Sequence, residues 1–442
     1  MALEELGDLV LNVILSKVGA KNAAILACVN RRLQSSASEE DVWRNFCLHD
    51  LDISVPEDPF GNPASSFKEA YKLWKEAFGM YPWSLVKRIK RCWTVLKSWL
   101  VLNFPEAAST LMRGASEAEI EEIEDALGVK LPIPTRILYR FCDGQDIPES
   151  VSPENEDSPA LGLIGGYWFY SYVVNVYLLP LRQILTETKD LIRQLGFVDG
   201  SKYIVVAISS FKEKYFFLNC TNGQLYVGTG NLTTEGEMLP SVPDTLIRCV
   251  HERKDCQQTD GMLLWLEEHG RRLQSGVVRV RKEGEIRSIS LFPELPPLCS
   301  TAVTNGVQIR ASACFVPELS DLQNDTEKYY FTYSIRMRLL SEGCVLDGIH
   351  SNSCQLFWRH WIIRANENIV SDVSDEAVIG MYPLLHPDGD EFVYESCARM
   401  PSSPGSIEGA FTFVPGRLID PKGGPFDVRV ARFPLEIPEY IF

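Results

Sequence analysis

Residues 3–33 read LEELGDLVLNVILSKVGAKNAAILACVNRRL, and the spacing of their apolar side chains decides the architecture of the N-terminus. Apolar residues recur every three or four positions, which is the period of an amphipathic α-helix. Gly19 and Asn22 interrupt this pattern. The spacing therefore predicts one helix of about three turns, a tight corner, a second helix ending near Arg32 and a third helix over residues 39–47.

Three short helices make a very small core. Roughly 45 residues bury little apolar surface, so we expect a partner to cover what this unit, residues 1–48, leaves exposed. The alternative is a helical cap on a larger domain.

The unit resembles the F-box, in which a leucine-rich opening precedes a Val-x-Arg segment and a closing tryptophan. Gly7 stands where F-boxes usually carry proline. The pattern is carried here by Leu6, Leu9, Ile14 and Leu15, then by residues 29–33, then by Val42 and Trp43. The resemblance implies that the Skp adaptor binds the following residues: Leu6, Leu9, Val10, Ile14, Leu15, Ile25, Val29, Leu33 and Trp43.

Composition indicates a soluble chain of several domains. Its 442 residues suffice for about three domains, and the net charge of -16 argues against nucleic acid as a partner. Twelve cysteines occur without a Cys-x-x-Cys pair and the N-terminus is acidic, so we expect a reduced chain in the cytoplasm and/or nucleus. The longest apolar stretch, residues 167–181, is interrupted and shorter than the roughly 20 residues of a spanning helix, so no membrane segment is expected.

Residues 52–66 are rich in Pro, Gly, Asn, Asp and Ser, which predicts a loop. Residues 67–110 return to helical spacing and are expected to form a helical connector. The connector carries a basic cluster that is a nuclear address, an anion site or the solvated face of a helix: Lys87, Arg88, Lys90 and Arg91.

Residues 111–255 predict an α+β domain, because helices are followed by strands. Ser116 and Glu119 form a capping box, and Ile120, Ile123 and Leu127 form the buried stripe of a helix that Gly128 ends. Five glutamates and Asp125 are expected on its outside. Strands are expected over residues 163–174, 203–209, 215–219 and 224–227.

This region resembles the SUKH (Smi/Knr-like) superfamily. The similar positions are Ser116, Glu119, Ile120, Glu124, Leu127, Gly128, Leu131, Pro132, Phe141, Asp143 and Gly144. The resemblance implies a protein-binding or regulatory module and no catalytic residues.

Residues 256–299 are expected to be a linker, with a connecting helix over 260–274 and a Pro-rich joint at 293–297. Residues 300–442 then alternate apolar and polar side chains over short runs, which predicts an all-β sandwich. The clearest runs are residues 307–315, 331–339, 411–413 and 426–430.

The last domain resembles the ApaG family over roughly 110 residues, which implies a fibronectin-III-like sandwich. The resemblance is carried, in order, by residues 330–336, 355–356, 359–361, 378–380, 383–385, 392–394, 407–409 and 433–435. Some bacterial members have a Gly-rich loop whose amides can cradle pyrophosphate. Residues 375–380 read DEAVIG, so side chains and negative charge replace glycines, and we expect weak phosphate affinity. The expected target-binding residues are instead Phe357, Trp358, Arg359 and Tyr382.

No cofactor, metal or catalytic residue is predicted. Cys344, His350, Cys354 and His360 lack the tight pair of a structural zinc site, and His360 has no activated nucleophile beside it. Asp388, Asp390 and Glu391 surround Gly389 as at a solvated hairpin tip.

The whole chain resembles F-box proteins of plants and animals with these three parts. This implies a non-catalytic substrate receptor of a Skp, cullin and F-box ubiquitin ligase, holding an unknown target protein through the SUKH and ApaG domains. Two alternatives stay open: an ApaG-type anion- or nucleotide-binding protein with a helical appendage, and an F-box scaffold without ubiquitination.

Overall fold

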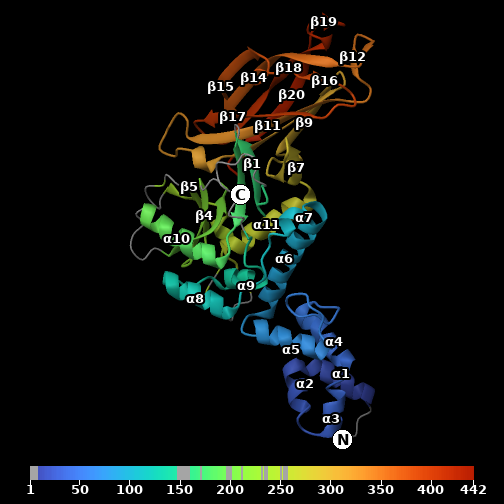
Figure 1. The fold of residues 1–442 in the computed structure, drawn as a ribbon, viewed down its shortest axis with the longest axis vertical. Helices are drawn as coiled ribbons and strands as arrows, with labels where there is room; N and C mark the ends of the chain where they lie inside the picture. The colour runs from blue at the N-terminus through green and yellow to red at the C-terminus, as the bar shows by residue number, and fades with distance from the viewer. Residues whose placement is uncertain are drawn as a thin grey trace.

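The computed structural model describes residues 8–146, 160–169, 172–195, 202–210, 213–229, 232, 237–248, 251 and 257–442. The described chain is elongated, with helices at one end, a mixed helix-and-sheet domain in the middle and a β-sandwich at the other end (Figure 1). These three parts confirm the predicted fold classes.

The N-terminal unit consists of α1 (Asp8–Val18), α2 (Ala20–Leu26), α3 (Arg31–Ser36), α4 (Glu40–Phe46) and a π-helical turn (Cys47–Leu51). Gly19 has a φ of 84°, which confirms the predicted corner between α1 and α2. The predicted end of the second helix near Arg32 is wrong. The helix ends at Leu26, because the side chain of Asn30 accepts a hydrogen bond from the Leu33 amide at 2.8 Å and so begins a separate helix.

The connector consists of α5 (Phe67–Phe78), α6 (Trp83–Asn103) and α7 (Pro105–Ala108). It joins the N-terminal unit to the middle domain through aromatic contacts on both sides. Tyr71 lies edge-on to Trp43, with ring centroids 5.5 Å apart, and Phe78 stacks on Phe141 of the middle domain at 4.7 Å. Helix α6 also contacts the π-helical turn and two helices of the middle domain.

The middle domain opens with α8 (Glu117–Leu127) and α9 (Ile133–Phe141), and the predicted capping box is present. The expectation that all its glutamates lie outside is wrong for Glu124, which is buried. The Glu124 carboxylate accepts hydrogen bonds from Lys130 at 2.8 Å, from the Leu131 amide at 2.9 Å and from the buried Arg136 guanidinium. Burial alone would raise the pKa of Glu124, but these hydrogen bonds hold it below its ordinary value.

The sheet of the middle domain has the order β6-β5-β4-β3-β2-β1-β8-β7. Its strands are β1 (Gly165–Phe169), β2 (Tyr172–Leu178), β3 (Tyr203–Ser209), β4 (Lys214–Asn219), β5 (Leu225–Thr229), β6 (Leu239–Pro240), β7 (Arg279–Glu283) and β8 (Ile286–Ser290). The strand predicted over residues 163–174 is thus two strands, and residues 170–171 lie outside the described residues. Helices α10 (Leu181–Leu195) and α11 (Gly261–Ser275) complete the domain.

The predicted linker over residues 256–299 is wrong, because most of this segment belongs to the middle domain. Strand β8 pairs in parallel with β1, at Gly166 and Ser290, and β7 extends the sheet beyond it. On α11 the Trp265 side chain is fully buried, with its ring 4.6 Å from that of Phe216 on β4. The helix is therefore part of the core and does not connect two separate bodies.

The sandwich begins at β9, within one residue of the predicted start. Its strands are β9 (Cys299–Thr304), β10 (Val307–Phe315), β11 (Tyr329–Leu339), β12 (Cys344–Leu346), β13 (Ile349–Ser351), β14 (Cys354–Ala365), β15 (Asn368–Glu376), β16 (Leu384–Leu385), β17 (Phe392–Met400), β18 (Gly405–Arg417), β19 (Asp420–Pro421) and β20 (Phe426–Leu435). One sheet has the order β17-β11-β10-β9; in the other, β15, β14, β18 and β20 pair in turn.

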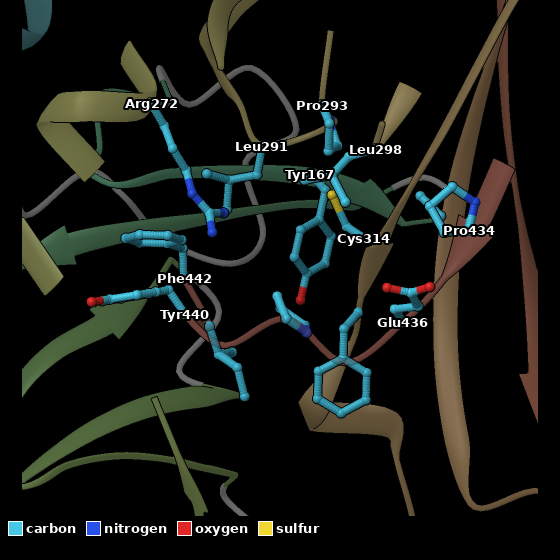
Figure 2. Close-up of a pocket in the computed structure, with 14 residues that line it drawn as sticks. Tyr167, Arg272, Leu291, Pro293, Leu298, Cys314, Pro434, Glu436, Tyr440 and Phe442 are labelled. Carbon is cyan, nitrogen blue, oxygen red and sulfur yellow. The ribbon is translucent and has the colours of Figure 1, made fainter. Parts of the chain in front are cut away.

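Residues 436–442, here called the tail, return from the sandwich to the middle domain. The Ile441 carbonyl accepts a hydrogen bond from the Trp265 indole at 2.7 Å, and the Phe442 ring stacks on that indole at 5.7 Å. A crevice of about 70 Å³ lies at this junction. Residues of both domains and of the tail line it (Figure 2). The expected joint between separately folding domains is therefore a buried junction.

Candidate interaction surfaces

Helices α1 and α2 and the turn that follows them expose four large apolar side chains: Val10, Val13, Ile25 and Val29, which are 49–63% exposed. Leu48 of the π-helical turn is also exposed. Their neighbours Leu11 and Ala23 point inward and are fully buried, since each helix presents alternate faces to the core and to solvent. The core is thus complete without these four residues. They are available to a partner, as the small size of the unit predicts.

The nine predicted adaptor-binding residues divide into four groups by exposure. Val10, Ile25 and Val29 are exposed, and Ile14 is partly buried. Leu15, Leu33 and Trp43 are buried, and the Trp43 indole donates a hydrogen bond to the Ala37 carbonyl at 2.7 Å, so these three pack within the unit. Leu6 and the side chain of Leu9 lie outside the described residues. Val13 was not among the predicted residues, but it is exposed as well, and its helical spacing from Val10 could have added it.

A groove of about 1100 Å³ lies between α2 and α5. Its apolar lining includes Ile25, Trp43 and Tyr71, and lysines of both helices stand along it. The exposed side of Ile25 therefore faces a hollow surface that continues onto the connector.

The predicted basic cluster of the connector is satisfied within the chain. Arg88 forms a bidentate ion pair with Glu267 of α11, with N–O distances of 2.7 and 2.6 Å. Lys87 donates to the His49 carbonyl and Lys90 to the Asp52 carbonyl, while Arg91 lies 3.4 Å from the Asp52 carboxylate. The cluster joins the connector to its neighbours.

In the sandwich, the predicted target-binding residues gather where β14 begins and β15 ends. The Phe357 and Trp358 rings stack at 5.7 Å and are 39% and 38% exposed. Tyr382 donates its hydroxyl to Glu376 at 3.0 Å, and Arg359 pairs with Asp375 at 3.2 Å. The hydrogen bond to Glu376 raises the pKa of Tyr382.

A tight turn follows β15 and adds two exposed apolar side chains, Ile379 and Met381, to this surface. Val378 and Met381 exchange backbone hydrogen bonds at 3.0 and 2.8 Å, with Ile379 and Gly380 between them at φ values of 45° and 75°. Two successive positive φ angles define a type I′ turn, which favours Asn or Gly and is strained for the β-branched Ile379. This turn was hard to predict from sequence, because Gly380 is the only residue in it that is typical of a type I′ turn.

The other candidate clusters lack the geometry of a site. In the described part of the chain, no three His, Cys, Asp or Glu side chains lie together in a way that could hold a metal ion. His360 pairs with Asp372 at 2.8 Å, and Glu391 holds Arg310 through two hydrogen bonds at 2.7 and 2.9 Å. Among the described helices, none has the length and apolar character needed to cross a bilayer.

Comparison with known proteins supports both downstream domains. Residues 114–245 match the SMI1/KNR4 family (SUKH-1), and residues 320–415 match the ApaG domain. Protein ApaG of Anaeromyxobacter dehalogenans is 32% identical over 31% of this chain and 96% of its own length.

The relatives that match over the whole of this chain are F-box proteins by name. F-box protein SKIP16 of Arabidopsis thaliana is 56% identical over 100% of both chains. F-box only protein 3 of Homo sapiens is 25% identical over 100% of this chain and 84% of its own length. The fold and these relatives define a multidomain F-box protein with SUKH and ApaG domains. Within that class, the chain belongs to the family of F-box protein SKIP16.

Proposed function

We propose that this chain is the substrate receptor of a Skp–cullin–F-box ubiquitin ligase, acting in the cytoplasm and/or nucleus. Membership of an F-box protein family supports the role. The observation that carries it is the set of four exposed apolar side chains on a unit whose own core is complete. Exposed apolar side chains on so small a unit favour a protein partner, here the Skp adaptor, which would link the chain to cullin.

Adaptor capture tests this role. In a Val10→Asp/Val29→Asp variant two charges enter the proposed interface, and we expect the adaptor to bind at least tenfold more weakly, since unpaired buried charge costs several kcal/mol. Both residues are exposed, so the fold should survive. Leu102→Asp on α6, at an 82% exposed position, is the matched control. Equal capture by the variant and the control would refute the adaptor-binding role.

We propose that the sandwich binds the target protein. Phe357, Trp358, Arg359 and Tyr382 form a partly exposed aromatic and charged cluster, and such residues are typical anchors of protein interfaces. The receptor itself performs no chemistry; it contributes by holding the target near the ubiquitin-charged enzyme. Quantitative mass spectrometry of proteins captured by the native chain, by Trp358→Ala and by Ile419→Ala as control should find targets lost from the Trp358 variant alone.

The turn after β15 should bind an anion such as phosphate only weakly. Ala377 and Ile379 carry side chains in a turn where a phosphate-binding loop would have bare glycine backbone, and Glu376 adds a negative charge. Calorimetry of the full chain with pyrophosphate and with ATP should therefore show no micromolar binding. Micromolar affinity for either would favour the anion-binding alternative.

A further inference from the structure

Strand β15 forms an open edge of the sandwich. It pairs only with β14 among the strands of its sheet, and all nine of its residues are at least partly exposed. A long exposed edge strand presents unpaired backbone donors and acceptors to any extended segment that approaches it. Proteins generally cover or protect such an edge, so its openness here requires an explanation.

The pairing with β14 identifies the backbone groups that face outward. Ala377 donates its amide to the Phe357 carbonyl at 3.0 Å, so in the antiparallel ladder every second residue before it also faces β14. Asp375 and Val373 are these residues. The amides of Ser374 and Asp372 therefore lie on the open edge.

The side chains of β15 indicate which segment would fit. The strand carries Asp372, Asp375 and Glu376 and no basic residue, and its acids repel acidic segments. Ile369 and Val373 are about half exposed and offer apolar contact beside them. The strand ends at the Phe357 and Trp358 rings and at the strained turn of Ile379, where a side chain from the same segment could anchor.

We propose that the sandwich takes its target as an added β-strand on the open edge of β15, the occupant being an extended segment with alternating basic and apolar side chains. Backbone hydrogen bonds to β15 supply affinity, and charge complementarity with Asp372 and Glu376 supplies selectivity. This inference rests on the proposed receptor function, which it deepens by naming the chemistry of the target.

The test uses a fluorescent seven-residue peptide of alternating valine and lysine with capped ends, and its valine and glutamate counterpart. Anisotropy with the full chain should show the lysine peptide binding at least tenfold more tightly. Hydrogen exchange should slow at the amides of Asp372 and Ser374. A lysine peptide with an N-methyl group on every residue offers no backbone donor on either edge, so it should bind at least tenfold more weakly than the unmodified peptide.

A matched pair of variants tests the same contact from the protein side. Ser374→Pro removes an outward donor that the β14 ladder does not use, so the sheet should tolerate it. We expect this variant to lose at least tenfold in affinity for the lysine peptide, and Ser374→Ala to stay within twofold of the native chain. Equal binding of the N-methylated peptide, equal binding by Ser374→Pro, or no binding of the lysine peptide to the native chain would each overturn strand addition. The first of these results would mean that the acids attract basic peptides without pairing.

The receptor role is tested separately, because adaptor capture depends on the N-terminal unit and not on β15. Loss of strand addition with normal adaptor capture would remove this inference alone. Loss of adaptor capture would remove the receptor role, whatever β15 binds.

Discussion

Lys214 and Glu318 form an ion pair at 3.7 Å between the middle domain and the sandwich, with side chains 0% and 3% exposed. Lys214 also donates to the Phe442 carbonyl at 3.0 Å and lies 4.4 Å from the centre of the Tyr167 ring. The Tyr167 hydroxyl donates to Glu318 at 2.6 Å. Complete burial lowers the pKa of Lys214, and the charge of Glu318 opposes that shift.

Removing one partner of this pair should destabilise the junction between the two domains. Lys214→Met leaves the buried Glu318 without its counter-charge, and we expect a loss of about 3–5 kcal/mol in the free energy of unfolding. Replacing both charges, in Lys214→Met/Glu318→Gln, should restore at least half of that loss. Urea unfolding of the two single variants and the double variant measures the coupling. Additive losses would show that the two side chains do not act as a pair.

Glu124 should stabilise the middle domain about as much as the Lys214–Glu318 pair stabilises the domain junction. Glu124→Ala leaves the buried Arg136 with only part of its hydrogen bonding, so the free energy of unfolding should fall by about 3–5 kcal/mol. Glu121→Ala, on the exposed side of the same helix, should change it by about 0.5 kcal/mol or less. Comparable losses at the two positions in urea unfolding would contradict the assigned role of Glu124.

An isoleucine at position 379 should lower the free energy of unfolding, because its backbone φ is positive. Asparagine tolerates the left-handed backbone, and the isoleucine side chain is 58% exposed, so Ile379→Asn should raise the free energy of unfolding by about 1 kcal/mol. Ile419→Asn, at a position that is 90% exposed and lacks a positive φ, should produce no gain. If Ile379 contacts the target, the stabilised variant should also bind it more weakly. A destabilised Ile379→Asn would show that the side chain packs favourably in the turn.

Glu395 should make stability depend on pH. Burial, with the nearby charge of Glu283, raises the pKa of Glu395 from 4.5 to about 7, although Arg336 opposes the shift. The folded state then binds more protons than the unfolded state between these values, so this contribution to stability is complete below pH 4.5 and is lost as pH rises through 7.

Glu395→Gln should remove that loss. Urea unfolding should find the variant more stable than the native chain at pH 8 and nearly equal to it at pH 5. Glu342→Gln, at an exposed position after β11, serves as the control. A difference between Glu395→Gln and the native chain that is the same at both pH values would contradict the raised pKa.

Local patterns made most of the fold predictable. Alternation along β10 and β11 reflects one face packed on the core, and the observed register opposes Ile309 to Met337 and Phe315 to Phe331. The capping box at Ser116 depends on residues three positions apart, so it is readable from sequence.

The features that were missed depend on contacts between distant residues. Strands β7 and β8 are short and partly exposed, and they join the sheet through a parallel pairing that only the assembled domain provides. Glu124 reads as a surface glutamate because its partner Arg136 lies on the next helix. The exposed apolar face of the N-terminal unit was only partly predictable, since helical spacing separates two faces but does not say which of them packs in the core.

The connector determines a property of the whole chain. Helix α6 contacts both the π-helical turn of the N-terminal unit and helices α9 and α11, and the tail fastens the sandwich to the middle domain, so the two ends in Figure 1 are held apart by continuous packing. In the proposed receptor, adaptor and target would therefore be separated by a set span. The distance between the two binding surfaces would then determine which lysines of a target receive ubiquitin: those at the matching distance from the segment held by β15. Shifting that segment by two residues would change which lysines are modified.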